Sequence, residues 1–477
     1  MHQTAISLPV VLPEAVLALG TLALVLYGAL RGERGTGVVN EVAVGLLGVV
    51  FILMVARNRP MGITFYGSFA DDAFTRFMGA LALVGSLVTL LLSIEFMRKE
   101  RIGGFEFPVL LLISTLGMLM LIAANDFIAL YLGFELMSLA LYVIAAYRRH
   151  DVRATEAGLK YFVLGALSSG MMLYGISLVY GYSGSVAFSA VANAVHDHAS
   201  IGVLFGLVFA LVGLAFKISV VPFHMWTPDV YEGVPTPVTT FFASAPKIAA
   251  MAVLVRVVMT AFPGIANDWR QILTFVSIAS MVLGAFAAIG QRNFKRLMAY
   301  SSIGHMGYAL VGLAAGTVEG AQSVIIYMAI YVVMTLGTFA AILSMRRAGR
   351  AVETIADLAG LARTDPTMAF FLATMMFSLA GVPPLAGFFA KFYVFAAAIK
   401  AGLYGLSVIG VLASCVAAYY YLRIVKLMYF DEPATPFDRP DTVARIVLAL
   451  SALMIILFVF LPSPITNAAM AAAQSLF

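Results

Sequence analysis

Six ionisable side chains interrupt long apolar stretches of this sequence. They are Glu135, Lys160, Lys217, Lys247, His305 and Lys391. An ionised side chain at the centre of a bilayer costs roughly 2.5–3.5 kcal/mol on insertion scales, so each of these residues needs a function or a partner. Carboxylates, amines and imidazoles all bind and release protons, and a neutral imidazole both donates and accepts. The residue types therefore indicate proton transfer within a membrane.

The balance of charge among these residues argues against a purely static role. Near mid-membrane the sequence offers one carboxylate, Glu135, and three lysines, so ion pairing cannot neutralise them all. Burial disfavours the charged form of a lysine, whereas a nearby carboxylate favours it. We therefore expect Glu135 to hold Lys217 protonated when the two are close, and separation of the pair to release the proton. Lys247 and His305 are expected to relay it, with water in between.

Two of the six residues admit a second interpretation. Lys160 lies in the first turns of its predicted helix, so its side chain could equally extend to the membrane surface. His305 could instead be a hydrogen-bonded packing residue between helices. Other polar residues nearby are candidates for the exit of the path or for hydrogen bonds to water: His224, Asp229, Glu232, Tyr300, Ser301 and Ser302.

The elements that must position these residues are membrane-spanning helices. The chain has 477 residues, of which 62% are hydrophobic and 11% charged, and this composition excludes a large soluble enzyme. A helix needs about 20 apolar residues to cross a bilayer. We predict an all-α integral membrane protein with about fourteen spans, at 8–30, 38–56, 75–96, 107–124, 126–147, 157–181, 201–231, 237–262, 271–290, 297–315, 321–345, 366–399, 402–430 and 442–462. Asp126 is the predicted N-cap that separates the fourth span from the fifth.

The arginine and lysine residues between the predicted spans give the orientation. Gaps after odd-numbered spans hold eighteen of them, whereas gaps after even-numbered spans hold only Arg57, Arg59, Arg270 and Lys400. Basic residues concentrate in cytoplasmic loops. The pattern therefore predicts that both termini are periplasmic.

Two predicted spans are too long for a single crossing and contain internal proline. The seventh is interrupted at Pro222 and Pro228, and the twelfth at Pro383 and Pro384. Proline removes a backbone donor and clashes with the preceding turn, so each span should break near its middle. Because the breaks are five helices apart, they predict two inverted five-helix repeats with a functional site at each break. The expected units are 1–106 with three helices, 107–262 and 271–430 as the repeats, and 431–477 with the last helix and tail.

The sequence contains none of the usual signatures of a redox or nucleotide site. Its single cysteine, Cys415, cannot build an iron–sulfur site, and there is no Walker loop and no dinucleotide-binding glycine pattern. The net charge of +5 comes from arginines beside the spans and forms no basic run, so no nucleic-acid partner is expected. We therefore expect no cofactor and no metal on this chain, and energy supplied by an ion gradient or a partner.

Three long motifs resemble the antiporter-like, proton-conducting subunits of respiratory complex I. They are FKISVVPFHMWTPDVYEGVPTPVTTFFASAPKIAA at 216–250, NFKRLMAYSSIGHMGYALVG at 293–312 and LAGVPPLAGFFAKFYVF at 379–395. The segment that begins NDFIALYLGFELMSLALYV at Asn125 resembles the subunit N branch of bacterial NADH-quinone oxidoreductase in particular. Lys391 also fits this branch, because subunit M has a glutamate there.

The resemblance implies a subunit of the proton-pumping membrane arm, multi-pass in a bacterial inner membrane. It assigns proton-pathway roles to Glu135, Lys217, Lys247, His305 and Lys391, and it favours such a role for Lys160. It also implies that FMN, iron–sulfur clusters and quinone reside in partner subunits of a proton-translocating NADH:quinone oxidoreductase. The expected partners are other membrane-arm subunits, including sister antiporter-like subunits, together with lipids, protons and water.

Two other functions remain open at this point. A subunit of a multi-subunit sodium/proton antiporter would share the motifs and need no redox partner. A substrate-coupled nutrient transporter is more remote, since it would require a substrate pocket.

Overall fold

The computed structural model describes residues 7–56, 60–196 and 200–477. Within these ranges the chain is almost wholly helical. The strands form two small antiparallel pairs: β1 (Gly62–Thr64) with β2 (Phe69–Asp71), and β3 (Arg346–Arg347) with β4 (Arg350–Ala351). Arg57 and Arg59, which contribute to the predicted orientation, lie outside the described residues.

At least one helix overlaps each of the fourteen predicted segments. The helices of the first half are α1 (Leu12–Arg31), α2 (Thr36–Val55), α3 (Ala73–Glu100), α4 (Glu106–Ala123), α5 (Phe127–Ala145), α6 (Val152–Ser183), α7 (Phe188–Ala194), α8 (Ile201–Ile218), α9 (Thr227–Gly233), α10 (Thr236–Ala243) and α11 (Ala245–Arg256). Those of the second half are α12 (Ala266–Ile289), α13 (Phe294–Ala314), α14 (Val318–Ser344), α15 (Leu361–Thr364), α16 (Pro366–Ala380), α17 (Ala386–Lys400), α18 (Tyr404–Phe430), α19 (Thr442–Leu457) and α20 (Ser463–Gln474). The predicted cap of α5 is confirmed, because Asp126 Oδ1 accepts a hydrogen bond from the Ala129 amide at 2.7 Å.

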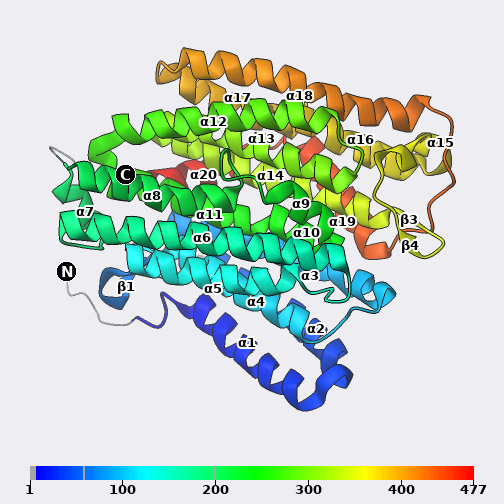
Figure 1. Cartoon of the computed structure of the whole chain (residues 1–477), viewed down its shortest axis with the longest axis horizontal. Coiled ribbons are helices and arrows are strands. Elements are labelled where there is room, and N and C mark those ends of the chain that lie inside the picture. The colour runs from blue at the N-terminus through cyan, green and yellow to red at the C-terminus, as the bar shows by residue number, and fades with distance from the viewer. Residues whose placement is uncertain (1–6, 57–59, 197–199) are drawn as a thin grey trace.

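Most of the long helices run lengthwise through a single bundle (Figure 1). Ten helical segments among the described residues are long and apolar enough to cross a membrane. The segment Thr236–Ala261 is wholly buried in the protein and Val318–Ser344 is 94% buried, whereas Leu12–Val55 is only 28% buried. The helices α10, α11 and α14 therefore form the centre of the bundle, and α1 and α2 lie at its edge.

Both predicted breaks are present. The helix α8 ends at Ile218, where Ser219 adopts a φ of 63°, and α9 begins at Thr227. The Trp226 indole donates to the Phe216 carbonyl at 2.9 Å and so satisfies a group that the broken helix leaves free. The second break separates α16 from α17 at Gly381, whose φ of 87° suits glycine. At each break, backbone polar groups inside the bundle therefore lack their helical partners and are available to side chains.

A third break contradicts the prediction of one continuous helix over 237–262. The chain turns at Ser244, with φ −111° and ψ −93°, between α10 and α11. Pro246 has no amide hydrogen for the preceding turn, and the Ser244 hydroxyl donates to the Thr240 carbonyl at 2.7 Å. As a result, Lys247 lies in the first turn of α11 instead of the middle of a long helix.

The C-terminal helix α20 was not among the predicted elements. Its Thr466 carbonyl accepts from the Gln322 side chain in α14 at 3.1 Å, and Ser475, just after it, accepts from the Phe74 amide at 3.2 Å. The helix therefore packs against α14 and α3, which also places the end of the chain against the start of α3.

Candidate functional site

Lys217 lies in an aromatic cage in the last turn of α8. Its side chain is 2% exposed, and Nζ donates to the Tyr161 hydroxyl at 2.9 Å. The nitrogen also lies 4.9–5.3 Å from the ring centres of Phe134, Tyr142 and Tyr161. Ring faces and the carbonyl end of a helix both attract a cation. The cage can therefore hold a lysine that is charged without a carboxylate in contact.

Glu135 lies in α5 next to the cage but does not contact Lys217. Its carboxylate accepts a hydrogen bond from Ser169 of α6, and the residue is partly exposed. No ion pair joins Glu135 to Lys217 within the described ranges, although the two charges still interact electrostatically. The structure thus has the expected pair in a separated arrangement.

Lys247 is fully buried at the start of α11. Its Nζ donates to Ser302 of α13 at 2.6 Å, and Ser302 in turn lies 2.6 Å from the Tyr331 hydroxyl of α14. The nitrogen also lies 5.5 Å from the ring centre of Tyr231. The amide end of a helix disfavours a cation. Lys247 is therefore in a different electrostatic environment from Lys217.

His305 lies one turn farther along α13 than Ser302, so the two share a helix face. Its Nδ1 lies 2.6 Å from the Tyr327 hydroxyl, and Nε2 lies 3.2 Å from the Tyr421 hydroxyl. Tyr421 is also hydrogen-bonded to Ser301. Both ring nitrogens therefore have hydroxyl partners, and hydroxyls can donate and accept.

Lys391 lies in α17 and reaches back across the second break. Its Nζ donates to the carbonyls of Leu379 and Ala380 at 3.2 and 2.9 Å and to the Ser414 hydroxyl at 2.8 Å. The nitrogen lies 4.8 Å from the ring centre of Tyr308. These carbonyls end α16, so the Lys391 nitrogen, like that of Lys217, lies at the carbonyl end of the first half of a broken helix, an environment that favours a cation.

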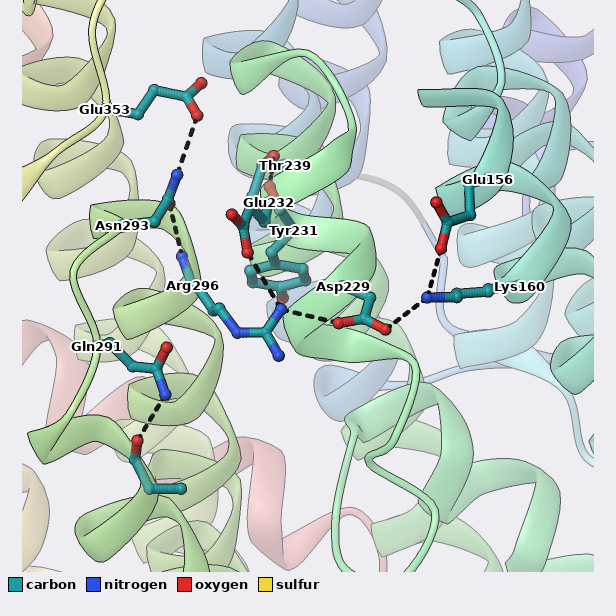
Figure 2. Close-up of polar contacts among 11 residues, drawn as sticks. Glu156, Lys160, Asp229, Tyr231, Glu232, Thr239, Gln291, Asn293, Arg296 and Glu353 are labelled. Atoms are coloured by element: carbon teal, nitrogen blue, oxygen red, sulfur yellow. Dashed lines mark hydrogen bonds and ion pairs between the residues drawn. The ribbon is translucent and has the colours of Figure 1, made fainter. Parts of the chain in front are cut away.

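Lys160 belongs to a separate, more exposed ion network (Figure 2). Its Nζ pairs with Glu156 at 2.8 Å and with Asp229 of α9 at 2.9 Å. Asp229 also pairs with Arg296 of α13 at 2.8 Å, and Glu232 contacts the same guanidinium at 3.1 Å. The Lys160 side chain is 43% exposed. One carboxylate therefore links α6 to α13 through the short half of the first broken helix.

The structure brings five of the six predicted residues together in two groups, and Lys160 lies apart from both. Lys217 and Glu135 lie beside the first break, whereas Lys247, His305 and Lys391 follow one face of α13. Sequence reasoning missed the tyrosines that contact them, which are Tyr161, Tyr327, Tyr331 and Tyr421. A tyrosine in an apolar helix is common in packing, so only its spatial neighbours reveal the contact. Ser301 and Ser302 do form hydrogen bonds, as the sequence indicated.

Two buried hydroxyls flank the first break without a hydrogen-bond partner among the described residues. They belong to Ser219, just after α8, and Thr227, at the start of α9. Buried polar groups usually bond to protein or to ordered water. Among all the residues that the structure describes, no cluster of three His, Cys, Asp or Glu side chains is suited to hold a metal ion. The chemistry available at these positions is therefore proton exchange among amines, an imidazole, hydroxyls and a carboxylate.

Comparison with known proteins gives the chain a family context. A family model described as NADH:quinone oxidoreductase/Mrp antiporter, TM, matches residues 124–417. NADH-quinone oxidoreductase subunit N of Beijerinckia indica is 64% identical over 474 residues, which cover 98% of this chain and 99% of that relative. A chain of respiratory complex I from Thermus thermophilus is 35% identical, with a TM-score of 0.83 over 96% of this chain and 99% of that one. A chain of the Mrp complex from Dietzia sp. DQ12-45-1b has a TM-score of 0.86 over 99% of this chain and 98% of that one, but its 21% identity shows similarity of fold alone.

Proposed function

Since this chain belongs to the NADH:quinone oxidoreductase/Mrp antiporter family of membrane proteins, in its subunit N branch, we propose that its buried basic side chains carry the protons. The chain is a multi-pass inner-membrane protein and a proton-translocating membrane-arm subunit of NADH-quinone oxidoreductase. Its partners are the other membrane-arm subunits. FMN, the iron–sulfur clusters and quinone chemistry are assigned to partner subunits in this proposal.

One observation carries the proposal. Lys217, Lys247, His305 and Lys391 are at most 6% exposed, and none forms an ion pair with a carboxylate in the described part of the chain. A buried charge without a counter-ion is costly, so static ion pairing does not account for these residues. Side chains that gain and lose a proton during turnover do account for them.

The proposed route follows the contacts in order. Lys217 exchanges protons with Lys247 through water near the break, where the Ser219 and Thr227 hydroxyls have no hydrogen-bond partner among the described residues. Lys247 then passes a proton through Ser302 to the α13 face, and His305 passes it toward Lys391. Movement of Glu135 toward or away from Lys217 would set whether the cage favours the charged lysine.

The membrane topology belongs to the same proposal. Fourteen spans, periplasmic termini and inverted repeats at 107–262 and 271–430 account for a helix in every predicted segment and for the two matching breaks. They also account for the similar surroundings of the Lys217 and Lys391 side-chain nitrogens, each beside the carbonyl end of a half-helix. Figure 1 shows that α1 begins toward the same end of the bundle as the one at which α20 lies.

A sodium/proton antiporter subunit is the alternative function and has less support, because the similarity to the Mrp complex shows the fold alone. Affinity purification through this chain distinguishes the two. We expect co-purification of partners with flavin and iron–sulfur clusters, and proton uptake by reconstituted vesicles on addition of NADH. Partners limited to small membrane proteins, with sodium-dependent proton exchange and no response to NADH, would contradict the proposal.

The ion network around Asp229, which the sequence suggested as an exit, is proposed here as the entry to this route. Asp229→Asn removes the charge that joins Lys160 to Arg296, and we expect NADH-driven proton pumping to fall about fivefold. The assembled complex should lose less than about 1 kcal/mol of stability, since partly exposed ion pairs contribute little. Pumping and thermal unfolding of the purified complex measure both effects. Arg363→Gln, which breaks an exposed ion pair with Glu432 elsewhere, is the matched control and should pump normally. Normal pumping by the Asp229→Asn complex would remove Asp229 from the route.

A further inference from the structure

A cavity of about 250 Å³ lies away from the proton route, where three helices meet. It is bounded by the end of α14 and by the first turns of α16 and α19. Asp365, just before α16, and Arg445, in the first turn of α19, contribute its charged groups. Met368, Phe371 and Leu448 contribute apolar wall. The cavity therefore has one polar part and one apolar part.

The length of the cavity is sufficient to span the boundary between lipid headgroups and acyl chains. It extends along α19 from before Thr442 to Ala449, a rise of about 10 Å at 1.5 Å per residue. The headgroup layer on each side of a bilayer is roughly 5–7 Å thick. Basic residues of the neighbouring segments, Arg346, Arg347 and Arg439, mark this end of the bundle as the one beside a polar surface.

The two charged groups of the cavity do not neutralise each other. The Arg445 side chain is exposed and forms no ion pair or hydrogen bond with the described residues. Asp365 accepts one hydrogen bond, from the Met368 amide at 3.0 Å, and forms no ion pair in the same part of the chain. A ligand that carries a negative and a positive group would satisfy both residues.

An exposed apolar face continues from the cavity along α19. Ile446, Leu450, Leu453 and Leu457 are all exposed, and their spacing places them on one side of the helix. Such a face next to a charged cavity fits a molecule with a polar head and long apolar chains.

We propose that this cavity binds a phospholipid whose headgroup carries both a phosphate and a primary ammonium, as phosphatidylethanolamine does. The phosphate bonds to Arg445 and the ammonium donates to Asp365, while the acyl chains lie along the exposed face of α19. A phosphatidylglycerol headgroup has no cation for Asp365. The quaternary ammonium of phosphatidylcholine has no N–H to donate to Asp365.

The test uses the assembled complex and a photoreactive phosphatidylethanolamine, with cross-linked peptides identified by mass spectrometry. We expect labelling of peptides from 366–380 and 442–457, and competition by unlabelled phosphatidylethanolamine but much less by phosphatidylcholine. Arg445→Gln should reduce labelling about tenfold, the factor for one lost charge-assisted bond. Arg350→Gln, an exposed arginine at the same end but outside the cavity, is the control and should label normally.

Asp365→Asn sharpens the test, because asparagine can still cap α16. In this variant the preference for phosphatidylethanolamine over phosphatidylglycerol should be lost. Equal competition by all three lipids, normal labelling of Arg445→Gln, or no labelling of these peptides because a neighbouring subunit covers them would each overturn the proposal.

Discussion

Lys217→Ala should reduce NADH-driven proton pumping by the assembled complex at least about tenfold, because it removes the titratable group beside the first break. Positioned acid–base groups typically contribute 10²–10⁴-fold to proton transfer. No carboxylate contacts Lys217 among the described residues, so its loss leaves no buried unpaired partner charge. The measurement is acidification of proteoliposomes that contain equal amounts of purified complex.

A second buried lysine provides the control for this variant. Lys295 is 2% exposed but pairs with Glu353 at 2.7 Å and donates to the Val234 carbonyl at 2.9 Å. Removing it breaks a partly buried ion pair, so Lys295→Ala should lower the yield and thermal stability of the complex. Each Lys295→Ala complex that assembles should still pump. If the Lys217→Ala complex also assembled in lower yield but still pumped protons, Lys217 would be a structural residue.

Lys247→Met should have a comparably large effect, because Lys247 is the lysine that donates directly to Ser302 on the α13 face. Its ammonium group is hydrogen-bonded to Ser302 at 2.6 Å, and methionine keeps most of the side-chain volume. The helix packing around this fully buried position should therefore survive, while proton pumping falls at least about tenfold.

Ser302→Ala separates the relay from the lysine itself. The variant leaves Lys247 in place but removes the hydroxyl between it and the α13 face. We expect pumping to fall here too, by less than in Lys247→Met, since water can replace a hydroxyl. Full activity of an assembled Lys247→Met complex would contradict the route through α13.

The sequence contained enough to predict the helical segments and the two proline breaks. Long apolar runs leave a helix as the simplest way to satisfy backbone groups in a bilayer, and paired internal prolines cannot continue one. The turn at Ser244 was missed because the sequence does not show that a new helix starts there. Only once the break is known can Pro246 be recognised as an ordinary first-turn proline of α11. Its consequence, the placement of Lys247 at a helix start, was missed with it.

The candidate site could be predicted only in part. Charged residues in apolar segments stand out in a sequence, so Lys217, Lys247 and Lys391 were identifiable. Their partners were not, because the Tyr161 hydroxyl and the carbonyls at the end of α16 are supplied by folding. Residue type alone predicted that Glu135 would influence Lys217 when the two are close, but it did not predict the ring faces and the helix end that surround the lysine in the structure. Lys160, whose position was compatible with two interpretations, pairs with Asp229, which lies 69 residues away in the chain and could not be identified as its partner from the sequence.

The claim that protonation changes on these lysines carry the proton is tested most directly by Lys217→Arg. Arginine keeps a positive charge at the cage but does not release its proton in proteins. The measurement is the number of protons moved per NADH oxidised by the reconstituted complex, with assembly verified by the yield of the purified complex. A lower ratio than in the unmodified complex is the predicted result. An unchanged ratio would show that a fixed positive charge suffices at this position and would contradict the account.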